Sequence, residues 1–452
     1  MSDRGLCWLV IVAGLLSAWI SIVYLPVENW DEARRAVNAL EMNCRGDYLD
    51  YYYLGAPDTF NTKPPLFVWL VAVTFKLLGP GVIALRLPSF LALAALLVYL
   101  RPWFTRRFGP HLAFMLLAAL VSVNGIIGHH VGISGDTDML FTLFVTVCLL
   151  EFYAFLESGA RVRLCWSVGA FCLAVLTKGV AVMLVVPGTL VAVLLHPNLY
   201  YRLTPRQWLP AALLLISGLT AATYLLSQMG QATLPQAGYA NLLQATFLRD
   251  GLQRLTDAGF EPAHHPFYIF EVLDTRFGLL IYGLYGFLVV AVVRFGIGGL
   301  WARLQRHFFG VFSLCIVVSV LGLLQWSESK HDWYVAPAVP FLTYLFARGL
   351  GVFLTRRSWR VGVMLLVVSW GIFGRGTQVQ SKRSNEPSLP VALAERVGAA
   401  DSLLVDPHLP QALAFRILLT AGRGGCQVGM LPAGASVEDC DLLLGRYGVC
   451  YE

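Results

Sequence analysis

Long apolar segments alternate with short polar segments along most of this chain. Eleven apolar segments approach the roughly 20 residues with which an α-helix crosses a bilayer. They cover residues 6–25, 84–101, 111–127, 138–156, 164–177, 180–196, 208–228, 275–293, 308–325, 333–350 and 359–376. The pattern therefore predicts an all-α polytopic membrane domain with about eleven transmembrane helices within residues 1–376.

The fifth and sixth apolar segments are short, and only Lys178 and Gly179 separate them. A single bent helix here would reverse the orientation of every later segment. The positive-inside rule favours two helices, because an N-terminus inside then places thirteen arginines on inner loops against Glu157 alone. These are Arg101, Arg106, Arg107, Arg161, Arg163, Arg202, Arg206, Arg294, Arg303, Arg306, Arg356, Arg357 and Arg360. We therefore expect the N-terminus in the cytoplasm and the C-terminus outside.

Composition narrows the class of protein. Of the 452 residues, 57% are hydrophobic and 13% are charged, and the mean hydropathy is +0.66. These values exclude a soluble domain. The net charge of +6 does not indicate a nucleic-acid partner, because the arginines are spread among short loops. No small-residue cleavage site follows the first apolar segment before Pro26, so we expect this segment to remain as a signal anchor.

Three polar regions are long enough to hold structure outside the bundle: a first outer loop at 26–83, a long outer loop at 229–274, and residues 377–452. In the first, PPLFVWLVAVTFKLL is too short to span and contains Lys76, which predicts an interfacial helix on the outer surface. In the last, DSLLVD and CDLLLGRYGV are typical of strands and LPVALAERVGA of a helix. We expect a small extracytoplasmic α/β domain there.

The first outer loop carries candidate chemistry at both ends. Asp31 precedes the helix-forming run EARRAVNALEM, where it either caps the helix or presents a carboxylate that accepts a proton. Glu32 follows it. Lys63 precedes Pro64 and Pro65, which stiffen the chain and set its position. Lys63 is then either a grip for an anionic group or an interfacial lysine.

Polar clusters recur in the later outer loops. In HHVGISGDTDML, Asp136 and Asp138 either cap the fourth apolar segment or act on a substrate. Lys178 lies between two apolar runs, where burying its charge without a partner is costly, so we expect it to have one. The alternative is that Lys178 snorkels to the membrane surface. For the histidines of HHPFYIF and SESKHDWY, the alternative is an ordinary loop residue. The remaining candidates come from these two stretches: His264, His265, Lys330, His331 and Tyr334.

The predicted topology brings carboxylates and cations from five loops to one face of the bundle. Such a face suits a substrate that bears phosphate, is attached to a lipid and approaches from the membrane. The sequence contains no HExxH, no pair of CxxC motifs and no P-loop, so we predict no metal and no cofactor. Four cysteines lie outside, and their three possible disulfide pairings stay open: Cys44, Cys426, Cys440 and Cys450.

Several stretches together resemble the GT-C glycosyltransferases, which use polyprenyl-phosphate sugars. The resemblance is closest to the bacterial lipid A aminoarabinose transferases, with protein O-mannosyltransferases as more distant relatives. It covers about residues 6–350 and is carried, in the family's order, by WDEARRAVNALEMNCRGDYL, NTKPPLFVWLVAVTFKLLG, ALRLPSFLALAALLVYL, GDTDMLFTLF, LTKGVAVMLVVPG, HHPFYIF and SKHDWYVAPAVPFL.

The resemblance implies a role for individual residues. Asp31 matches the catalytic carboxylate and Asp138 the aspartate of the second outer loop, while the lysines match cations near the donor phosphate: Lys63, Lys178 and Lys330. Candidate substrate contacts are Glu32, Asp136, His264, His265, His331 and Tyr334. Lys63 matches the lysine of a KPPL-like motif. In the aminoarabinose transferases a glutamate commonly precedes this lysine, but Thr62 stands here. If that glutamate holds a metal, this chain lacks that site.

The implied reaction is an inverting transfer of a sugar from a polyprenyl-phosphate donor to a lipid, glycan or protein acceptor. It would take place at the outer face of a bacterial inner membrane, among membrane lipids and without nucleic acid. Two alternatives stay open: a lipid-linked sugar transporter or flippase, and a non-catalytic assembly subunit. A flippase is expected to show ionisable residues at mid-membrane and often an internal repeat. An assembly subunit would not need all of the candidate site residues.

Overall fold

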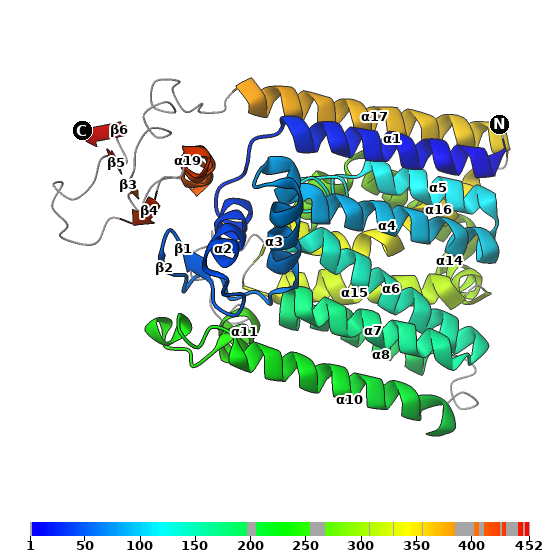
Figure 1. Cartoon of the computed structure of the whole chain (residues 1–452). Helices are drawn as coiled ribbons and strands as arrows, with labels where there is room; N and C mark the ends of the chain where they lie inside the picture. Colours follow the sequence, from blue (N-terminus) through cyan, green and yellow to red (C-terminus); the bar gives the residue numbers. More distant parts are fainter. Residues whose placement is uncertain are drawn as a thin grey trace.

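The computed structural model describes residues 2–196, 205–253, 267–306, 308–328, 330–354, 356–384, 402–405, 411–424, 427–430, 442–445 and 448–451. Within these ranges, nine helical stretches are long and apolar enough to cross a membrane, and they run side by side (Figure 1). They are Asp3–Tyr24 (α1), Val82–Phe108 (α4), Thr137–Ser158 (α6), Arg161–Leu194, Trp208–Gln228, Leu280–Gln305, Phe308–Trp326 (α15), Asp332–Val352 and Arg357–Gln380. The protein is an integral membrane protein, as its composition predicts.

The stretch Arg161–Leu194 runs the length of the bundle twice. Helix α7 (Arg161–Lys178) ends beside the start of α6, where Lys178 contacts Asp138. A 3-10 turn (Gly179–Val185) and helix α8 (Val186–Leu194) then return the chain to the other end. There the His196 ring lies 4.8 Å from Phe308, which also stacks on Tyr153 near the end of α6. The break therefore falls at Lys178 and Gly179, as the sequence indicates.

One apolar segment is shorter than expected. The segment 111–127 contains helix α5 (Pro110–Ser122), whose 13 residues end before a glycine-containing loop. In this loop the backbone N–H of Gly125 donates to the carbonyl of Arg276 at 2.9 Å. A Cβ on Gly125 would lie 2.9 Å from the Val339 side chain, so the loop packs closely into the bundle. The total of eleven crossings stays a prediction.

Short elements lie across one end of the bundle, which we call the polar end. Helices α2 (Asp31–Arg45) and α3 (Leu66–Leu78) run transverse to the long helices (Figure 1). Between them, strands β1 (Tyr52–Tyr53) and β2 (Ala56–Pro57) pair as an antiparallel hairpin. Helix α3 begins directly after Pro65 and buries one face against α2 and α4. Its place across the end of the bundle agrees with the interfacial helix expected for PPLFVWLVAVTFKLL.

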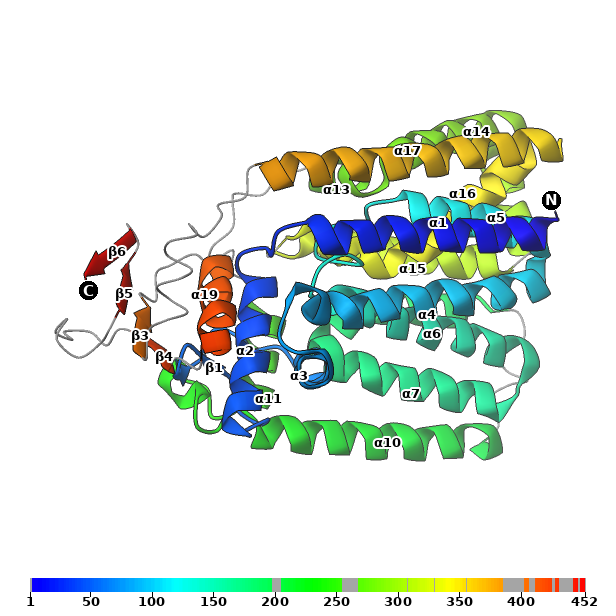
Figure 2. The same ribbon diagram turned by 45° about the horizontal axis from the view of Figure 1, so that its top comes forward.

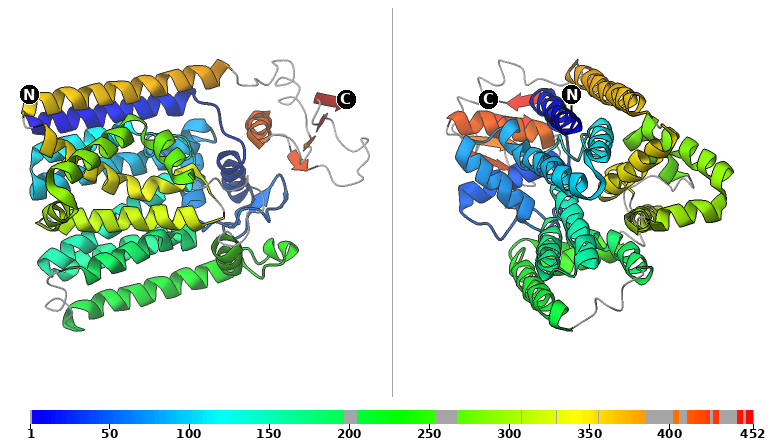
Figure 3. Two further views of the ribbon diagram at one scale, coloured as in Figure 1. Left: turned by 180° about the vertical axis from the view of Figure 1, so that it is seen from behind. Right: turned by 90° about the vertical axis from the view of Figure 1, so that its right-hand side faces the viewer.

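Further elements complete the two ends of the bundle. Helix α10 (Pro205–Gln228) leads to α11 (Leu242–Phe247) and the π-helical turn Leu248–Gln253 at the polar end. Helices α13 (Tyr268–Phe277), α14 (Leu279–Arg306), α16 (Val339–Phe353) and α17 (Arg357–Ser384) follow. At the opposite end, where the N-terminus lies (Figure 3), Arg357 pairs with Asp3 at 2.6 Å and Arg107 with Glu157 at 2.9 Å.

An α/β unit covers part of the polar end. The strands are β3 (Ser402–Val405), β4 (Gln427–Met430), β5 (Leu442–Gly445) and β6 (Gly448–Tyr451), in the order β4-β3-β5-β6, with only β6 antiparallel to its neighbour. Helix α19 (Gln411–Gly424) lies beside α2 (Figure 2). Its fully buried Phe415 stacks 6.3 Å from Phe75. The run LPVALAERVGA lies outside the described residues, and so do Cys426 and Cys440.

Candidate functional site

A buried ion pair joins four segments at the polar end. Both Glu32 oxygens contact Arg86, at 2.6 and 2.8 Å, and they also accept the backbone N–H groups of Glu28 and Gly135. Arg86 in turn donates to the carbonyls of Ile22, Leu25 and Pro26 at the end of α1. Burial alone would raise the pKa of Glu32, but Arg86 outweighs burial and holds it low. Glu32 is thus enclosed by protein groups, and its contact with substrate stays a prediction.

Asp31 is the most accessible carboxylate in this region. It is the first residue of α2, and the N-cap position belongs to Trp30, which makes no side-chain capping bond. The expected N-cap therefore lies one residue earlier. The Asp31 side chain is 38% exposed and its Oδ2 lies 3.5 Å from Arg35 Nη2, one helical turn later. Its carboxylate is thus reachable by a ligand.

Arg35 connects Asp31 to a second, buried carboxylate. Arg35 Nη1 lies 3.0 Å from Asp136 Oδ1, and Asp136 Oδ2 lies 2.8 Å from His130 Nδ1. Asp136 also caps α6 by accepting the backbone N–H of Thr137. Burial opposes the charge on Asp136, but Arg35 and His130 outweigh burial and hold its pKa far below the usual range. Burial likewise lowers the pKa of His130, but Asp136 outweighs this and raises it overall.

Asp138 and Lys178 form a second buried pair. Asp138 lies in the first turn of α6 and Lys178 is the last residue of α7, and their side chains are 3% and 7% exposed. Lys178 Nζ contacts Asp138 Oδ1 and lies 4.3 Å from the centre of the Tyr334 ring. Lys178 is therefore not a snorkelling lysine. The structure therefore brings three of the candidate residues together here: Asp138, Lys178 and Tyr334.

Stacked rings connect these groups to the turn before α16. Trp333 lies between two imidazoles, 3.8 Å from His130 and 4.3 Å from His331. The same turn is anchored by Asp332, which binds Arg276 with two contacts at 2.7 and 2.8 Å. His331 and Tyr334 thus lie close to His130 and Lys178, and their contact with substrate stays a prediction. The sequence alone did not single out Trp333 or Arg35, although Arg35 stands one helical turn after Asp31 in DEARR.

Lys63 takes its partner from the long outer loop. Lys63 Nζ lies 2.9 Å from Asp250 Oδ1, and the Thr62 hydroxyl donates to Asp250 Oδ2 at 3.0 Å. The neighbouring Pro64 packs near Gly179, because a Cβ there would lie 3.4 Å from Pro64 Cγ. Lys63 and Lys178 therefore come from adjoining turns. Lys330 Nζ lies 5.5 Å from the Tyr268 ring, and the convergence of all three lysines on one phosphate stays a prediction.

Metal ligation has one candidate group within the described ranges. Ligand atoms of Asp31, His130 and Asp136 lie within 4.8 Å of one another. The Arg35 guanidinium already contacts both carboxylates and supplies positive charge there. This arrangement disfavours a cation and agrees with the expectation of no metal, which stays a prediction. His264 and His265 lie outside the described residues.

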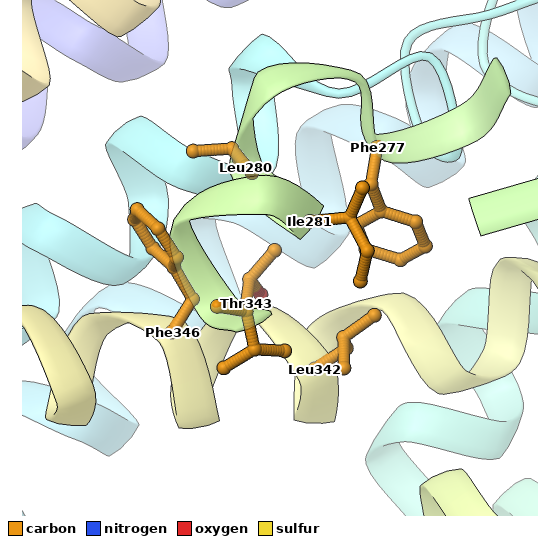
Figure 4. Close-up of a pocket in the computed structure, with 7 residues that line it drawn as sticks. Phe277, Leu280, Ile281, Leu342, Thr343 and Phe346 are labelled. Carbon is orange, nitrogen blue, oxygen red and sulfur yellow. The ribbon is translucent and has the colours of Figure 1, made fainter. Parts of the chain in front are cut away.

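A small apolar pocket lies between α14 and α16, beside the end of α13 (Figure 4). It is bounded by Phe277, Leu280, Ile281, Leu284, Leu342, Thr343 and Phe346. None of these residues ionises, so the cavity is not where charge chemistry takes place. It begins at Phe277, next to Arg276, and Arg276 Nη1 donates to the carbonyl of His129 at 2.9 Å. Apolar and polar regions therefore adjoin.

Comparisons with known proteins identify similar folds and a similar family. Residues 62–237 match the family model described as dolichyl-phosphate-mannose-protein mannosyltransferase. Among solved structures, ArnT from Cupriavidus metallidurans bound to undecaprenyl phosphate is similar over 96% of this chain and 87% of that chain, with 16% identity and a TM-score of 0.71. The apo state of the same protein is similar over the same shares, with 16% identity and a TM-score of 0.66.

A comparison with curated protein sequences finds no significant match. The family match covers the first outer loop from Thr62 onward, the pair Asp138–Lys178 and helix α10. The structural match covers nearly the whole chain. The chain therefore has the fold of ArnT and resembles the dolichyl-phosphate-mannose-protein mannosyltransferases over residues 62–237, which confirms the resemblance to GT-C glycosyltransferases drawn from its sequence.

Proposed function

We propose that this protein is an inverting glycosyltransferase that transfers a sugar from a polyprenyl-phosphate donor to an acceptor outside the cytoplasm. One observation carries the proposal: the accessible Asp31 carboxylate lies at the polar end of an apolar bundle, beside buried cationic groups. Arg35 contacts both Asp31 and Asp136, and Lys178 contacts Asp138, which follows Asp136 in the first turn of α6. A lipid-linked phosphate and a hydroxyl acceptor need these two kinds of group. The family match to lipid-phosphate mannosyltransferases supports the reaction class.

The reaction follows from the charges. A bond forms between the acceptor oxygen and the anomeric carbon as the bond from that carbon to the phosphate oxygen breaks. Asp31 takes the acceptor proton, and the polyprenyl phosphate leaves with the electron pair. Lysines fixed in a region of low dielectric stabilise the charge that grows on the phosphate. We assign this role to Lys63, Lys178 and Lys330, with Asp138 holding Lys178 in place.

The nature of the carrier is proposed from two observations. The similar ArnT structure is bound to undecaprenyl phosphate. In this chain, the long apolar helices end at the polar end (Figure 1), so a carrier with an apolar tail in the bilayer can bring its phosphate to that end. We propose a bacterial inner membrane with the polar end outside, a hexose or pentose as the sugar, and a lipid, glycan or protein as the acceptor.

The test uses purified protein in lipid nanodiscs and a panel of undecaprenyl-phosphate sugars. Water is always present as a slow acceptor, so release of undecaprenyl phosphate reports activity without a known acceptor. We expect one donor to be consumed by the wild type and not by Asp31→Asn. Mass spectrometry of glycolipids and glycans from cells with and without the gene then identifies the modified product. Failure of every donor, together with unchanged glycans, would refute the proposal.

A further inference from the structure

We infer that Asp250 is a built-in counter-ion of Lys63 that weakens the hold of Lys63 on the phosphate product and so promotes its release. The inference rests on the proposed function, in which Lys63 binds the donor phosphate. It concerns the long outer loop at residues 229–274, in which the sequence alone identifies no partner for Lys63. Asp250 is a positioning residue in this scheme and does not touch the reacting carbon.

Asp250 contacts both Lys63 and Thr62 through its carboxylate oxygens. Asp250 Oδ1 lies 2.9 Å from Lys63 Nζ, and Oδ2 accepts the Thr62 hydroxyl at 3.0 Å. The Asp250 side chain is 5% exposed, whereas that of Lys63 is 16% exposed. The carboxylate is therefore more enclosed than the lysine side chain. An anion that reaches Lys63 meets the carboxylate as its neighbour.

Asp250 is held in place by the loop that carries it. Thr246 donates its hydroxyl to the Thr62 carbonyl at 3.0 Å, and Arg249 donates to the Thr59 carbonyl at 3.1 Å. Further along the same interface, Asp50 Oδ1 accepts the Ala232 N–H and the Thr233 hydroxyl, each at 3.2 Å. These bonds fix the two outer loops against each other. The negative charge of Asp250 therefore stays near Lys63 when a phosphate arrives.

Donor and product differ in charge at this point. The donor is a phosphodiester with a single negative charge, whereas the released polyprenyl phosphate is a monoester whose second proton dissociates near pH 6. A fixed carboxylate repels the more highly charged product more strongly than the donor. Lys63 without Asp250 would hold the product too tightly, and release of product limits many enzymes. Asp250 thereby biases the site toward release.

The experiment measures the affinity of full-length protein in nanodiscs for undecaprenyl phosphate. We expect Lys63→Ala to bind about tenfold more weakly and Asp250→Asn to bind about three- to tenfold more tightly, in line with the strength of partly buried charge pairs. The double variant should bind like Lys63→Ala, because the effect of Asp250 acts through the lysine. Asp50→Asn, at the same loop interface, is the matched control and should leave affinity unchanged.

A pH series adds a measurement that a merely structural role would not change. The ratio of affinities between Asp250→Asn and wild type should grow from about pH 5 to about pH 8, as the phosphate monoester loses its second proton. Thr62→Val removes a hydrogen bond to Asp250 but keeps its charge, and it should behave like wild type. Melting temperatures confirm that each variant is folded.

The outcomes separate the two levels of the argument. If undecaprenyl phosphate binds the wild type and Lys63→Ala equally, or does not bind at all, the assignment of Lys63 to the donor phosphate in the proposed function fails. If Lys63→Ala weakens binding but Asp250→Asn binds no more tightly than wild type, only the counter-ion inference fails. A tighter Asp250→Asn with a pH-independent ratio also overturns it, because the product charge would then play no part.

Discussion

At the scale of single residues, Asp31 separates a catalytic role from a structural one. The N-cap of α2 is Trp30, and the Asp31 carboxylate lies 3.5 Å from Arg35. Asp31→Asn should therefore melt within a degree or two of wild type, because exposed ion pairs contribute about 1 kcal/mol at most. Sugar transfer should fall about 100-fold or more, since an amide cannot accept the proton.

The matched control for this prediction lies in the same helix. Glu41 and Arg45 also form a pair four residues apart, at 2.8 Å, near the other end of α2. Glu41→Gln should keep both its melting temperature and its transfer rate. An Asp31→Asn variant that transfers sugar at the rate of Glu41→Gln would remove Asp31 from the mechanism.

The pair of His130 and Asp136 predicts a pH dependence of stability. The pKa of His130 is raised from its usual 6.5, so its stabilising contribution is complete below about pH 6.5 and is lost as pH rises through the folded pKa. The pKa of Asp136 is lowered, so its own contribution is lost only in acid. His130→Gln should therefore destabilise the protein more at about pH 6 than at about pH 9. Melting temperatures at both values check this, and an equal loss at both would contradict it.

The sequence identifies single chemical groups better than it identifies their partners. Asp31 and Lys178 stand out because charge beside an apolar run is unusual. Their roles depend on neighbours that only the fold supplies: Asp250 follows Lys63 by almost two hundred residues, and Trp333 reaches His130 from another loop. The partner of Glu32 could not be predicted for the same reason, because Arg86 is buried in the middle of an apolar pattern and gives no local signal.

At the scale of elements, the turn after α7 depends on one glycine. Gly179 has φ +57°, and a Cβ there would lie 2.6 Å from Thr246 Cγ2. Gly179→Ala should therefore displace Thr246 or Lys178 and lower both donor binding and turnover, in addition to the backbone cost of an alanine with positive φ. Gly46 has φ +70° with no atom within 4 Å of its Cβ position, so Gly46→Ala carries only the backbone cost. Equal undecaprenyl phosphate affinity in the two variants would contradict the prediction.

Apolar periodicity locates helices well where their length matches the bilayer. It overestimates the helix at residues 123–127, because α5 ends at Ser122 and a closely packed loop with several glycines follows. A Cβ on Gly132 would lie 2.5 Å from the Ile126 carbonyl oxygen, and one on Gly135 would lie 2.6 Å from Leu85. Helix α19 was also missed, because its apolar face is complete only once it packs on α2.

At the scale of the whole molecule, the arginine distribution predicts the orientation of the bundle. Gly109, between α4 and α5, lies near the N-terminus, because His111 pairs with Asp3 at 3.6 Å. Helix α17 runs from that end toward the polar end (Figure 1). A reporter fused after Gly109 should report the cytoplasm, and one fused after Ser384 should report the outside. Protease-accessibility or phosphatase-reporter assays check both sites. The same side for both fusions would be incompatible with the bundle described.

The contact between α19 and α2 has a consequence for the order in which the protein matures. The Ala412 N–H donates to Asn29 Oδ1 across 383 residues of chain, and Phe415 covers Phe75. The helical bundle is therefore synthesised before α19, the segment that covers α2. A nascent chain stalled after Ser384 should leave Phe75 open to chemical labelling when a cysteine replaces it, and the same cysteine should be protected once α19 has emerged. Equal labelling of the cysteine before and after α19 has emerged would show that α19 does not protect this position.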